Sequence, residues 1–485
     1  MIEVLIDFDD TKKKGLIISD YLSNIREYFS VEDKQQAFKR RYAVGYRPST
    51  RKYVVTPQGR FEPRFLPEIV KYVESLRLSG TAANLQLTQK FTEKTNIPEL
   101  RDILFKLNRQ LRDYQEEAVK ECLKQKSGIV VLPTSAGKTL VIATLCKSVQ
   151  EQIPSKRALI LVPDIQLVQQ TYGDFLDYGI CESEITKWTG GNTPDFSKNI
   201  IIANSQILLS KKQDLDVLES INLLIIDEVH KCKQGNSIVK ILKKIPAKYR
   251  FGFTGTLPVD QIDRWGLCGE LGDTIYTKKS IELREQKYIT QVNVGVICVH
   301  HKVQPNFTQA SITNPTAEYE EEIQFLQQNE FRNDVIYKLV SKMEKNSLIM
   351  VDRINHGEIL FEKIKNIANK QVFFVQGSVE IEEREKIRNI MENNNNVICI
   401  AISKIFSTGI NIRNLHYVVF ASIGKAKNKI IQSIGRSLRL HETKKSAYIL
   451  DIADNLKYSA AHMNERVSLY SSESIKFTIK DVYQS

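Results

Sequence analysis

Short runs of apolar residues, each bounded by polar turn or helix signals, recur along two stretches of the chain. The first stretch covers residues 128–256 and contains the runs GIVVL, RALILV, NIIIA, NLLIID and RFGFTG. Runs of this length, rich in β-branched residues, are typical of strands buried on both faces of a parallel sheet. Amphipathic segments such as residues 140–150 lie between them and are long enough for crossover helices. The pattern therefore predicts a doubly wound α/β domain.

A second series with the same spacing covers residues 347–452 and contains SLIMV, QVFFV, VICIAI, YVVFA and AYILDI. It predicts a second α/β unit in tandem with the first. Residues 303–335 between the two series are polar, and the segment YEEEIQFLQQNEFRNDVIYKLV has a helical apolar period. We expect a linker helix there that leads into the second unit.

The first hundred residues differ in character, because they contain prolines at positions 48, 57, 63 and 67 and no alternation of strand and helix signals. Tyr42, Val44 and Tyr46 alternate with other residues before the turn signal of residues 48–50. This arrangement predicts a β-hairpin within a small separate domain.

Length and composition narrow the class of protein. A chain of 485 residues is several times longer than a typical domain, so two or three packed domains are expected. Lys and Arg number 69 against 57 Asp and Glu, and this net charge of +12 favours a polyanionic partner while being equally compatible with simple solubility. The seven cysteines form no Cys-x-x-Cys pair, which disfavours a zinc knuckle or a disulfide framework. Without a leader segment or an apolar run of about 18 residues, the chain is expected to be soluble and cytoplasmic.

A candidate phosphate-binding loop follows the run GIVVL. Backbone N–H groups of such a loop and of the helix after it cradle phosphates, Lys138 can reach the β- and γ-phosphates, and the Thr139 hydroxyl can hold Mg²⁺. Leu132 stands where the usual pattern has Gly, so a chance turn is the alternative for the loop taken alone. The loop PTSAGKT comprises Pro133, Thr134, Ser135, Ala136, Gly137, Lys138 and Thr139.

The run NLLIID ends in the sequence Asp227-Glu228-Val229-His230, which contains two carboxylates. Ligands of open α/β sheets bind at the carboxyl ends of the strands. There Asp227 can orient Mg²⁺, and Glu228 can polarise the water that attacks the γ-phosphate. A solvated acidic turn is the alternative, but the apolar strand and the upstream phosphate loop argue against it. The two motifs together predict a site for ATP and Mg²⁺ with Lys138, Asp227 and Glu228 as catalytic residues.

Most of residues 110–440 resemble superfamily 2 helicases, which are built on two RecA-like domains. DEVH is a form of their DEAD/DEAH box, and PTSAGKT matches their first motif apart from Ser135, where Gly is usual. The resemblance implies that Gln115 in LRDYQEEAV reads the adenine edge. It also implies that hydrolysis is coupled to strand movement by His230 and by the hydroxyls of FTGT, which are Thr254 and Thr256.

Further motifs of these helicases concern the nucleic acid and the second domain. LVPDIQLVQQ and NSQIL resemble motifs Ia and Ib, which implies contacts to the nucleic-acid backbone from Pro163, Ser205 and Gln206. AISKIFSTGINI resembles motif V, with Ser403 for the usual Thr and Asn411 for the usual Asp, and implies nucleotide contacts from Gly409 and Asn411. QSIGRSLR resembles motif VI, in which Arg436 and Arg439 face the γ-phosphate with support from Gln432. Such an arginine stabilises charge that develops in the transition state.

Within this superfamily the segment GTLPVDQIDRWGLCGELGDTIYTKKSIELREQKYI is similar to the region after motif III in XPB-like and phage UvsW-type helicases. NEFRNDVIYKLV and MVDRINHGEIL strengthen the match to this branch-migration family, which is also RecG-like. The resemblance implies an ATP-dependent DNA helicase or translocase, with ATP and Mg²⁺ as cofactors. Its substrates would be forks and Holliday junctions in recombination, repair and replication, in the host cytoplasm if the protein is phage-encoded. A monomer is favoured.

These inferences predict an α/β protein with two tandem RecA-like parallel-sheet domains and a small N-terminal α+β accessory domain. We expect an accessory DNA-binding domain at residues 1–95 and the ATP-binding RecA-like domain at residues 96–285. The C-terminal RecA-like helicase domain is expected at residues 286–452, followed by a helical tail at residues 453–485.

Three other functions are compatible with parts of the pattern. An RNA helicase would share every catalytic residue, because no motif here reads a 2′-hydroxyl unambiguously. A translocase subunit of a nuclease complex would need a nuclease in another chain, since Asp7, Asp9 and Asp10 are expected in a solvated turn. An ATP-gated binding protein without hydrolysis is disfavoured, because Lys138, Glu228 and Arg436 are all present.

Basic residues are concentrated between positions 34 and 64, opposed over that stretch only by Glu62. Such an excess is typical of a phosphate footprint, and interleaved aromatic residues can stack on exposed bases. The alternative is that the aromatic residues form the core of this small domain and the charges solvate its surface. The basic residues are Lys34, Lys39, Arg40, Arg41, Arg47, Arg51, Lys52, Arg60 and Arg64, and the aromatic ones are Phe38, Tyr42, Tyr46, Tyr53 and Phe61. We predict DNA contacts from Arg40, Arg41, Tyr42, Arg47, Arg51 and Lys52.

Overall fold

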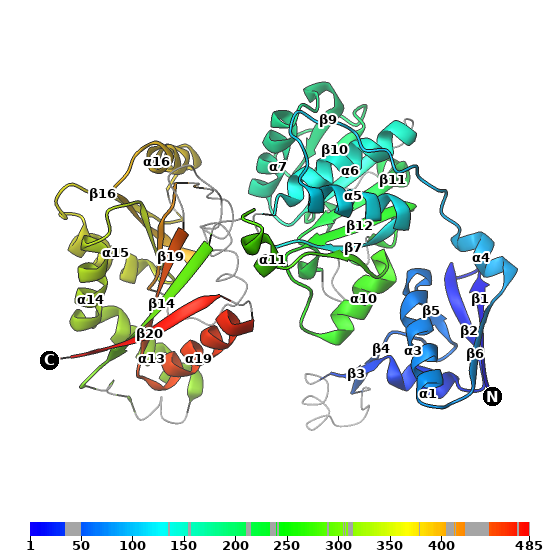
Figure 1. Cartoon of the computed structure of the whole chain (residues 1–485), viewed down its shortest axis with the longest axis horizontal. Coiled ribbons are helices and arrows are strands. Elements are labelled where there is room, and N and C mark those ends of the chain that lie inside the picture. Colours follow the sequence, from blue (N-terminus) through cyan, green and yellow to red (C-terminus); the bar gives the residue numbers. More distant parts are fainter. Residues whose placement is uncertain are drawn as a thin grey trace. The chain divides into compact units, whose positions relative to one another are not determined.

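The computed structural model divides the chain into two compact units. Unit 1 comprises Met1–Leu132 and Gly137–Lys278, and unit 2 comprises Pro133–Ala136 and Lys279–Ser485. Each unit contains a seven-stranded parallel sheet accompanied by helices (Figure 1). The predicted α/β fold with two tandem RecA-like domains is therefore confirmed. The structure describes residues 1–33, 50–133, 136–153, 157–209, 215–232, 239, 242–288, 291–303, 305, 307–308, 314–377, 379–403, 412, 414–421, 446–472 and 475–484.

The N-terminal region of unit 1, residues 1–95, contains a four-stranded sheet in the order β5-β2-β1-β6. Strand β1 pairs antiparallel with β2 and parallel with β6, so this region has the predicted α+β character. The hairpin predicted around residues 42–46 lies outside the described residues. The elements are β1 Ile2–Asp9, β2 Lys14–Ile18, α1 Leu22–Tyr28, β3 Ser30–Glu32, β4 Arg51–Tyr53, β5 Arg60–Phe61, the 3-10 helix η1 Pro63–Phe65, α3 Leu66–Leu78, β6 Ala83–Leu87 and α4 Gln89–Thr95.

The N-terminal region packs against helix α10 (Gln261–Leu271), which belongs to the first RecA-like domain. The Trp265 ring on α10 lies 5.3 Å from the ring of Phe29 and 6.5 Å from that of Phe65, both in edge-to-face orientation. Charged contacts surround this aromatic core, since Lys243 Nζ lies 2.5 Å from Glu62 Oε1 and Arg64 Nη2 donates to the Lys248 carbonyl at 3.1 Å. Aromatic burial of this kind is a large source of stability, so the N-terminal region and the first RecA-like domain share one core.

The sequence predicted a solvated turn for Asp7, Asp9 and Asp10, and for the first two of these residues the prediction is wrong. Asp7 and Asp9 belong to strand β1. Asp7 accepts a hydrogen bond from the Thr88 hydroxyl at 2.7 Å, and Asp9 forms an ion pair with Arg60 at 2.6 Å. Asp10 does lie in the following turn, where it pairs with Lys90. These contacts link the strands and helices of the N-terminal region to one another.

The sheet of the first RecA-like domain has the strand order β13-β7-β12-β11-β8-β10-β9, and all its strand pairs are parallel. Five of the strands coincide with the five predicted apolar runs, because those runs are buried on both faces as inferred. The strands are β7 Ser127–Val131, β8 Arg157–Val162, β9 Ile185–Trp188, β10 Ile200–Asn204, β11 Ile221–Asp227, β12 Tyr249–Thr254 and β13 Thr274–Thr277. The helices besides α10 are α5 Asp113–Gln125, α6 Lys138–Gln152, α7 Ile165–Asp177 and α8 Leu215–Glu219, with 3-10 turns at η2 Glu182–Glu184, η3 Ile207–Leu209 and η4 Val229–Lys231.

The sheet of unit 2 has the order β16-β17-β15-β18-β19-β14-β20 and is also parallel throughout. The second series of predicted apolar runs forms β15 to β19. The strands are β14 Gln291–His300, β15 Ser347–Val351, β16 Gln371–Val375, β17 Val397–Ile402, β18 Tyr417–Phe420, β19 Ser446–Asp454 and β20 Lys476–Tyr483. The helices are α11 Ser280–Glu285, α13 Pro315–Gln328, α14 Glu330–Ser341, α15 Ile354–Ile364, α16 Ile381–Asn393 and α19 Lys457–Ser472.

Two elements of unit 2 differ from the sequence prediction. The expected single linker helix is two helices, because Asn329 adopts an extended backbone that ends α13 and its side chain caps α14 by accepting from the Arg332 amide at 2.9 Å. The segment 453–485 is not only a helical tail, since it ends in β20, which pairs with β14. The alternating polar residues of KFTIKDVY suit an edge strand. Because they leave no continuous apolar run, the sequence pattern did not predict this strand.

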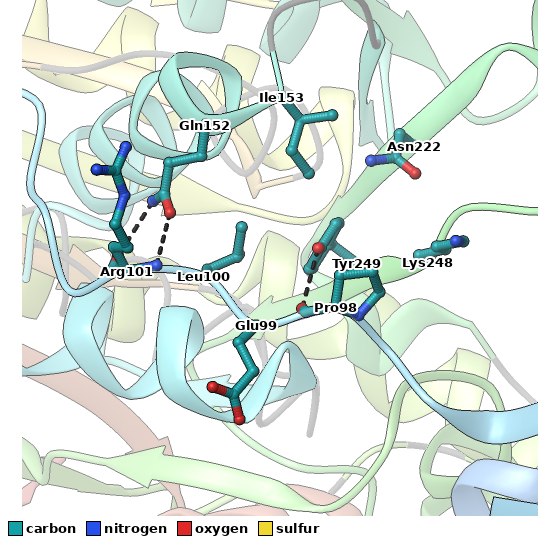
Figure 2. Close-up of a pocket in the computed structure, with 9 residues that line it drawn as sticks. All are labelled: Pro98, Glu99, Leu100, Arg101, Gln152, Ile153, Asn222, Lys248 and Tyr249. Atoms are coloured by element: carbon teal, nitrogen blue, oxygen red, sulfur yellow. Dashed lines mark hydrogen bonds between the residues drawn. The ribbon is translucent and has the colours of Figure 1, made fainter. Parts of the chain in front are cut away.

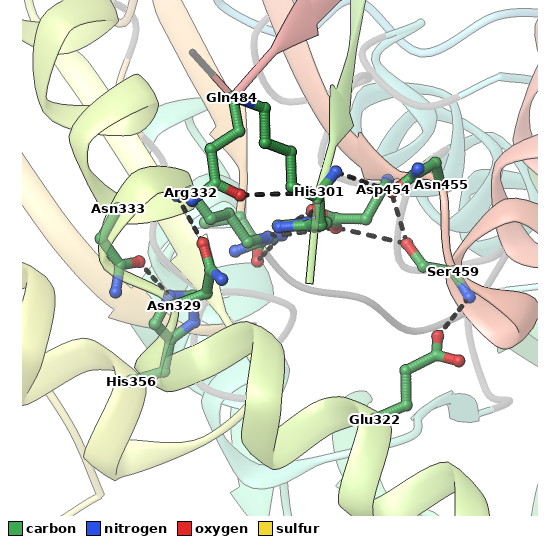
Figure 3. A network of polar contacts seen from close by, with 12 residues as sticks. His301, Glu322, Asn329, Arg332, Asn333, His356, Asp454, Asn455, Ser459 and Gln484 are labelled. Atoms are coloured by element: carbon green, nitrogen blue, oxygen red, sulfur yellow. Dashed lines mark hydrogen bonds and ion pairs between the residues drawn. The ribbon is translucent and has the colours of Figure 1, made fainter. Parts of the chain in front are cut away.

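A buried polar network fixes α14 to the sheet of unit 2 (Figure 3). Arg332 on α14 is fully buried, and its Nε lies 3.0 Å from each carboxylate oxygen of Asp454 at the end of β19. His301 Nε2 lies 2.9 Å from the same carboxylate, and the Ser459 hydroxyl also contacts it. Paired, hydrogen-bonded charges are the form in which charged groups are tolerated in a core, so this network is structural.

Among the described residues, no helix combines the length and the apolar character needed to cross a membrane.

Candidate nucleotide site

The end of the predicted phosphate loop at residues 137–139 and the predicted acidic motif lie at the carboxyl ends of neighbouring strands of unit 1. Strands β7, β12 and β11 are adjacent in the sheet, and they lead into Lys138, Thr254 and Asp227 respectively. The Leu132 amide donates to the Thr254 carbonyl at 2.9 Å, which ties the end of β7 to the end of β12. The parallel topology therefore brings together residues that are up to 116 positions apart in the sequence, as in other open α/β sheets.

Gly137 forms the last turn of the loop before helix α6. Its φ of +76° lies in the left-handed region that favours glycine. A Cβ at this position would lie 2.4 Å from Gln115 Nε2, so a larger residue would also have to displace the end of that side chain. Helix α6 begins at Lys138, so its first backbone N–H groups point out of the helix end, where the helix dipole favours an anion.

Gln115 is the glutamine predicted to read adenine. It lies in the first turn of α5, is 3% exposed, and its Oε1 accepts a hydrogen bond from the Arg112 amide at 2.9 Å. Its amide nitrogen faces Gly137, so the structure brings the predicted adenine-reading residue next to the phosphate loop.

Lys138 and Glu228 form an ion pair that is too long for a hydrogen bond, with Nζ 3.7 Å from Oε1. The two side chains are 10% and 19% exposed, so the pair is largely buried but retains some access to solvent at this edge of the sheet. Thr139 follows in the first turn of α6 and is half-buried. These groups are held close together and keep access to solvent.

The two acidic residues have opposite electrostatic environments. Burial, together with the neighbouring Glu228 carboxylate, raises the pKa of Asp227. Burial alone would also raise the pKa of Glu228, but Lys138 and His230 outweigh it and lower that pKa below its usual range. Glu228 has a left-handed backbone, with φ of 52°, and its amide donates to Asp227 Oδ1 at 2.9 Å. A non-glycine residue held in this region is strained, which is common where a side chain must be aimed.

A chain of contacts leads from Glu228 to the motif FTGT. His230 Nδ1 lies 3.3 Å from Glu228 Oε2 and 2.9 Å from the Thr254 hydroxyl. The Thr254 hydroxyl donates to the Thr256 carbonyl at 2.7 Å. The predicted coupling residues therefore form a chain of contacts, in which His230 contacts the predicted base Glu228, Thr254 contacts His230, and Thr256 contacts Thr254.

The residues predicted to touch nucleic acid in unit 1 lie together at the carboxyl ends of β8 and β10. Pro163 follows β8, while Ser205 and Gln206 follow the neighbouring strand β10. Asn204 links them, since its Nδ2 contacts the Pro163 carbonyl at 3.4 Å and its Oδ1 accepts from the Gln206 amide at 2.7 Å. Asn204 was not among the predicted site residues, and its position as the first letter of NSQIL was the only signal for it.

Two of the predicted N-terminal DNA contacts are described, and both are already paired. Arg51 lies 3.1 Å from Glu27, and Lys52 lies 3.0 Å from Asp33. These acidic partners precede the basic stretch in the sequence, so the local charge excess is smaller in three dimensions than in the sequence. Phe61 is buried in the core of the region, as in the structural alternative for the aromatic residues.

The remaining predicted site residues lie outside the described residues. They are Thr134, Ser135, Arg40, Arg41, Tyr42, Arg47, Gly409, Asn411, Gln432, Arg436 and Arg439.

A separate cavity of about 470 Å³ lies at the amino ends of strands of the same sheet (Figure 2). It is lined by Asn222 and Tyr249 at the amino ends of β11 and β12 and by the segment that follows α4. Gln152 at the end of α6 makes two hydrogen bonds to the backbone of Arg101, and Tyr249 donates to the Pro98 carbonyl at 3.1 Å. Because this cavity lies at the amino ends of the strands, it is distinct from the nucleotide site.

Comparisons with known proteins match both RecA-like domains. The family model described as "Type III restriction enzyme, res subunit" matches residues 108–259, and the "Helicase conserved C-terminal domain" matches residues 332–441. The solved structure of the ATP-dependent Type ISP restriction-modification enzyme LlaBIII bound to DNA is similar in fold, with a TM-score of 0.58 and 14% identity over 86% of this chain and 34% of that chain.

Two curated relatives are helicases or translocases. The DNA 3'-5' translocase XPB2 of Sulfurisphaera tokodaii is 35% identical over 214 residues, which cover 43% of this chain and 44% of the relative. The ATP-dependent DNA helicase uvsW of Enterobacteria phage T4 is 30% identical over 394 residues, which cover 76% of each chain. With this identity and coverage, and with the order of motifs described above, the chain belongs to the UvsW-type family of superfamily 2 DNA helicases.

Proposed function

We propose that the protein is an ATP-dependent DNA helicase or translocase that unwinds or branch-migrates branched DNA, such as forks and Holliday junctions. The observation that supports this most strongly is the continuous contact of Lys138, Glu228, His230 and Thr254 at one edge of the first RecA-like sheet. Such an arrangement suits a site in which a change at the nucleotide phosphates is transmitted to the end of the neighbouring β-strand, β12. Family membership supports the choice of DNA.

The residues at this edge fit ATP and Mg²⁺. The N-terminus of α6, preceded by Gly137, offers backbone N–H groups to the phosphates, with Lys138 beside them. The hydroxyl of Thr139 and the carboxylate of Asp227 are hard oxygen donors of the kind that Mg²⁺ prefers. When bound, Mg²⁺ would neutralise charge on the β- and γ-phosphates.

Glu228 is suited to accept a proton from the attacking water. Lys138 and His230 keep its carboxylate ionised, because they lower its pKa. Its strained backbone aims the carboxylate toward Lys138 rather than along the strand. We assign to Arg436 and Arg439 the stabilisation of charge that develops on the γ-phosphate, with Gln432, Gly409 and Asn411 in supporting positions, on the strength of their place in motifs V and VI.

His230 and Thr254 give hydrolysis a route into the rest of unit 1. Thr254 ends strand β12, and helix α10 begins seven residues later, at Gln261. Because α10 packs against the N-terminal region through Trp265, a shift at the end of β12 can reach that region. We propose residues 1–95 as an accessory DNA-binding domain on this basis, followed by RecA-like domains at residues 96–285 and 286–452.

The test is the stimulation of ATP hydrolysis by different nucleic acids. The full chain is assayed with a four-way DNA junction, a forked duplex, a linear duplex, single-stranded DNA and RNA, each at matched nucleotide concentration. We expect the largest stimulation with the junction or the fork, and strand separation or branch migration that depends on ATP. The variant Lys138→Ala serves as the control for contaminating ATPase. Stimulation by RNA alone would replace the proposal with an RNA helicase, and ATP turnover without any DNA stimulation would contradict it.

A further inference from the structure

We propose that Cys298, His300 and Asp481 form a binding site for a zinc-like divalent transition-metal ion, which clamps the terminal strand β20 onto β14. This site lies in unit 2 and is separate from the nucleotide site. It is independent of the proposed function, because it concerns a different set of residues and a different chemistry.

The three residues share one face of the β14–β20 pair. In this parallel pair Cys298 is the register partner of Asp481, and His300 is the register partner of Tyr483. Residues two apart on a strand point to the same face, so Cys298 and His300 project to the side on which Asp481 lies. Strand pairing thereby places three different metal-binding side chains together, although Asp481 is about 180 residues away in the sequence.

The donor atoms are close enough for one ion. One atom from each side chain, the thiol sulfur, an imidazole nitrogen and a carboxylate oxygen, lies within 4.8 Å of the other two. Zinc binds thiolate sulfur at about 2.3 Å and nitrogen or oxygen at about 2.0–2.2 Å, so ligand atoms around a tetrahedral ion are roughly 3.3–3.7 Å apart. Adjusting the present positions to that spacing needs side-chain shifts of about an ångström, which rotation about χ1 and χ2 can supply.

The type of donor selects the class of ion. A thiolate and an imidazole are soft or borderline ligands that favour Zn²⁺ and similar ions over Mg²⁺ or Ca²⁺. The imidazole ring is held in place by stacking on Tyr483 at 4.4 Å, and the 2.7 Å contact between its Nε2 and Asp481 Oδ1 would be replaced when an ion binds between the two groups. Cys298 is 7% exposed, whereas Asp481 is half-exposed, so an ion can enter from the solvent side and complete its coordination with water.

A second cluster of potential metal ligands differs from this one, because a lysine ammonium group already pairs with its carboxylates. Glu68, Cys268 and Asp273 in unit 1 also bring their donor atoms together. There Lys71 forms ion pairs with both Glu68 and Asp273, so an ammonium group already supplies the positive charge. In the part of the chain that the structure describes, the only ion pair of Asp481 is with His300. Among the described residues, the β14–β20 cluster therefore has its three potential ligands without a Lys or Arg paired to its carboxylate.

The location indicates a structural role. Strand β20 is at the edge of the sheet and is hydrogen-bonded to β14 on one side only. Several of its side chains are exposed, including Ile479 and Tyr483, so apolar burial holds it weakly. An ion shared by β14 and β20 (green and red in Figure 1) would hold the strand near its last residue.

The first experiment measures metal binding by the full reduced chain after treatment with a chelator. Co²⁺ is titrated as a spectroscopic substitute for Zn²⁺, without nucleotide, and the thiolate-to-metal absorption band is followed. We expect one equivalent of Co²⁺ to give this band, and Zn²⁺ to abolish it by displacement. The band distinguishes this site from the nucleotide site, which contributes no thiolate.

Substitutions then assign the ligands. Cys298→Ala should remove the band, and His300→Ala or Asp481→Asn should weaken Co²⁺ affinity at least tenfold, since each removes one ligand. Cys181→Ala is the matched control, because Cys181 is an exposed cysteine in unit 1 and its loss should leave the band unchanged. A band that survives Cys298→Ala, or Co²⁺ affinity that is the same in all four variants, would overturn the proposal.

Hydrogen exchange supplies a readout that does not depend on Cys298. Added Zn²⁺ should slow amide exchange across residues 476–483 at least fivefold in the wild-type chain and in Cys181→Ala, and have no such effect in His300→Ala. Because the His300 side chain is partly exposed, this variant is expected to fold normally. Exchange in β20 that ignores Zn²⁺ in the wild-type chain would contradict the clamp.

Discussion

Two clusters of charged residues, one in each unit, contain the same types of residue but differ in contact length and in exposure to solvent. In unit 1, Lys138, Glu228 and His230 have contacts of 3.7 and 3.3 Å and side chains that are 10–19% exposed. In unit 2, Arg332, Asp454 and His301 have contacts of 3.0 and 2.9 Å and no exposed side-chain surface. Both contain a cation, a carboxylate and a histidine.

The difference separates a site from a structural network. The unit 2 cluster is closed to solvent and joined by short bonds, so its charges serve mainly to satisfy one another. Burial and the adjacent Arg332 lower the pKa of the neighbouring His356 to about 3, so that histidine stays neutral. The unit 1 cluster has long contacts, a strained residue at Glu228 and access from solvent, which leaves its charges available to a ligand. The types of charged residue do not distinguish the two clusters, whereas contact length and accessibility do.

The largest expected effect is on catalysis. Lys138→Ala should abolish ATP hydrolysis, because the remaining groups cannot replace its charge beside the phosphates. Stability should fall much less than on loss of a buried pair with short bonds, because the Lys138–Glu228 contact is 3.7 Å long and retains some access to solvent. Steady-state ATPase and thermal unfolding of the same preparation check both statements. DNA binding should be largely retained, and unchanged turnover would remove Lys138 from the site.

The matching change in unit 2 should act on stability. Arg332→Ala leaves the buried Asp454 without its cation, which typically costs about 3–5 kcal/mol. Denaturant unfolding followed by a probe in unit 2 measures this loss. The double variant Arg332→Met with Asp454→Leu should recover much of it, because an apolar pair of similar volume can replace a buried ion pair. A single variant as stable as the wild type would mean that the network is not structural.

A smaller effect is expected at the contact between the nucleotide site and β12. His230→Ala removes hydrogen bonds to Glu228 and Thr254, and a bond to a charged group contributes roughly 1.5–3 kcal/mol, which corresponds to about ten- to a hundredfold in rate. We expect this loss in DNA-stimulated turnover, with basal turnover reduced less. Equal reduction of the two rates would show that His230 supports hydrolysis only and does not couple it to DNA.

The smallest effect is expected in the N-terminal region. Arg51 and Lys52 are already paired with Glu27 and Asp33, so replacing both with Ala should lower the salt slope of junction binding by less than the roughly 0.9 per phosphate contact of a free cation. Replacing Arg40 and Arg41 should lower it more, and should weaken binding to all sequences alike. Affinity measured at several salt concentrations compares the two pairs, and equal slopes in all variants would assign the basic stretch to solvation.

Point substitutions test the DNA contacts of the N-terminal region better than deletion of the region does, because deletion would uncover apolar residues of α10. Removing residues 1–90 would expose Ile262, Trp265 and Cys268 on α10, which pack in the core of the N-terminal region. A truncated chain could lose activity through aggregation rather than through loss of DNA contacts.

Five strands of each sheet could be predicted, because continuous apolar runs leave a local signal, and short motifs predicted that Lys138 and Glu228 lie near one another at the ends of such strands. Lys138 follows a predicted strand after a short loop, and Glu228 follows one directly. Features that depend on three-dimensional pairing could not be predicted. The break at Asn329 has no periodic signal, β20 is an edge strand with alternating polar residues, and Cys298 meets Asp481 only through sheet register. The partners of Arg51 and Lys52 likewise come from outside the stretch in which charge was counted.

The most direct test of the account is the behaviour of Glu228→Gln. The amide keeps the shape of the side chain but cannot accept a proton from water, and general base catalysis contributes roughly 10²–10⁴-fold to rate. Equilibrium binding of ATP and single-turnover hydrolysis are measured on the same variant with a four-way junction present. We predict ATP affinity within a few-fold of the wild type and hydrolysis slowed by at least about a hundredfold. Hydrolysis at the wild-type rate would contradict the assignment of this edge of unit 1 as the catalytic site.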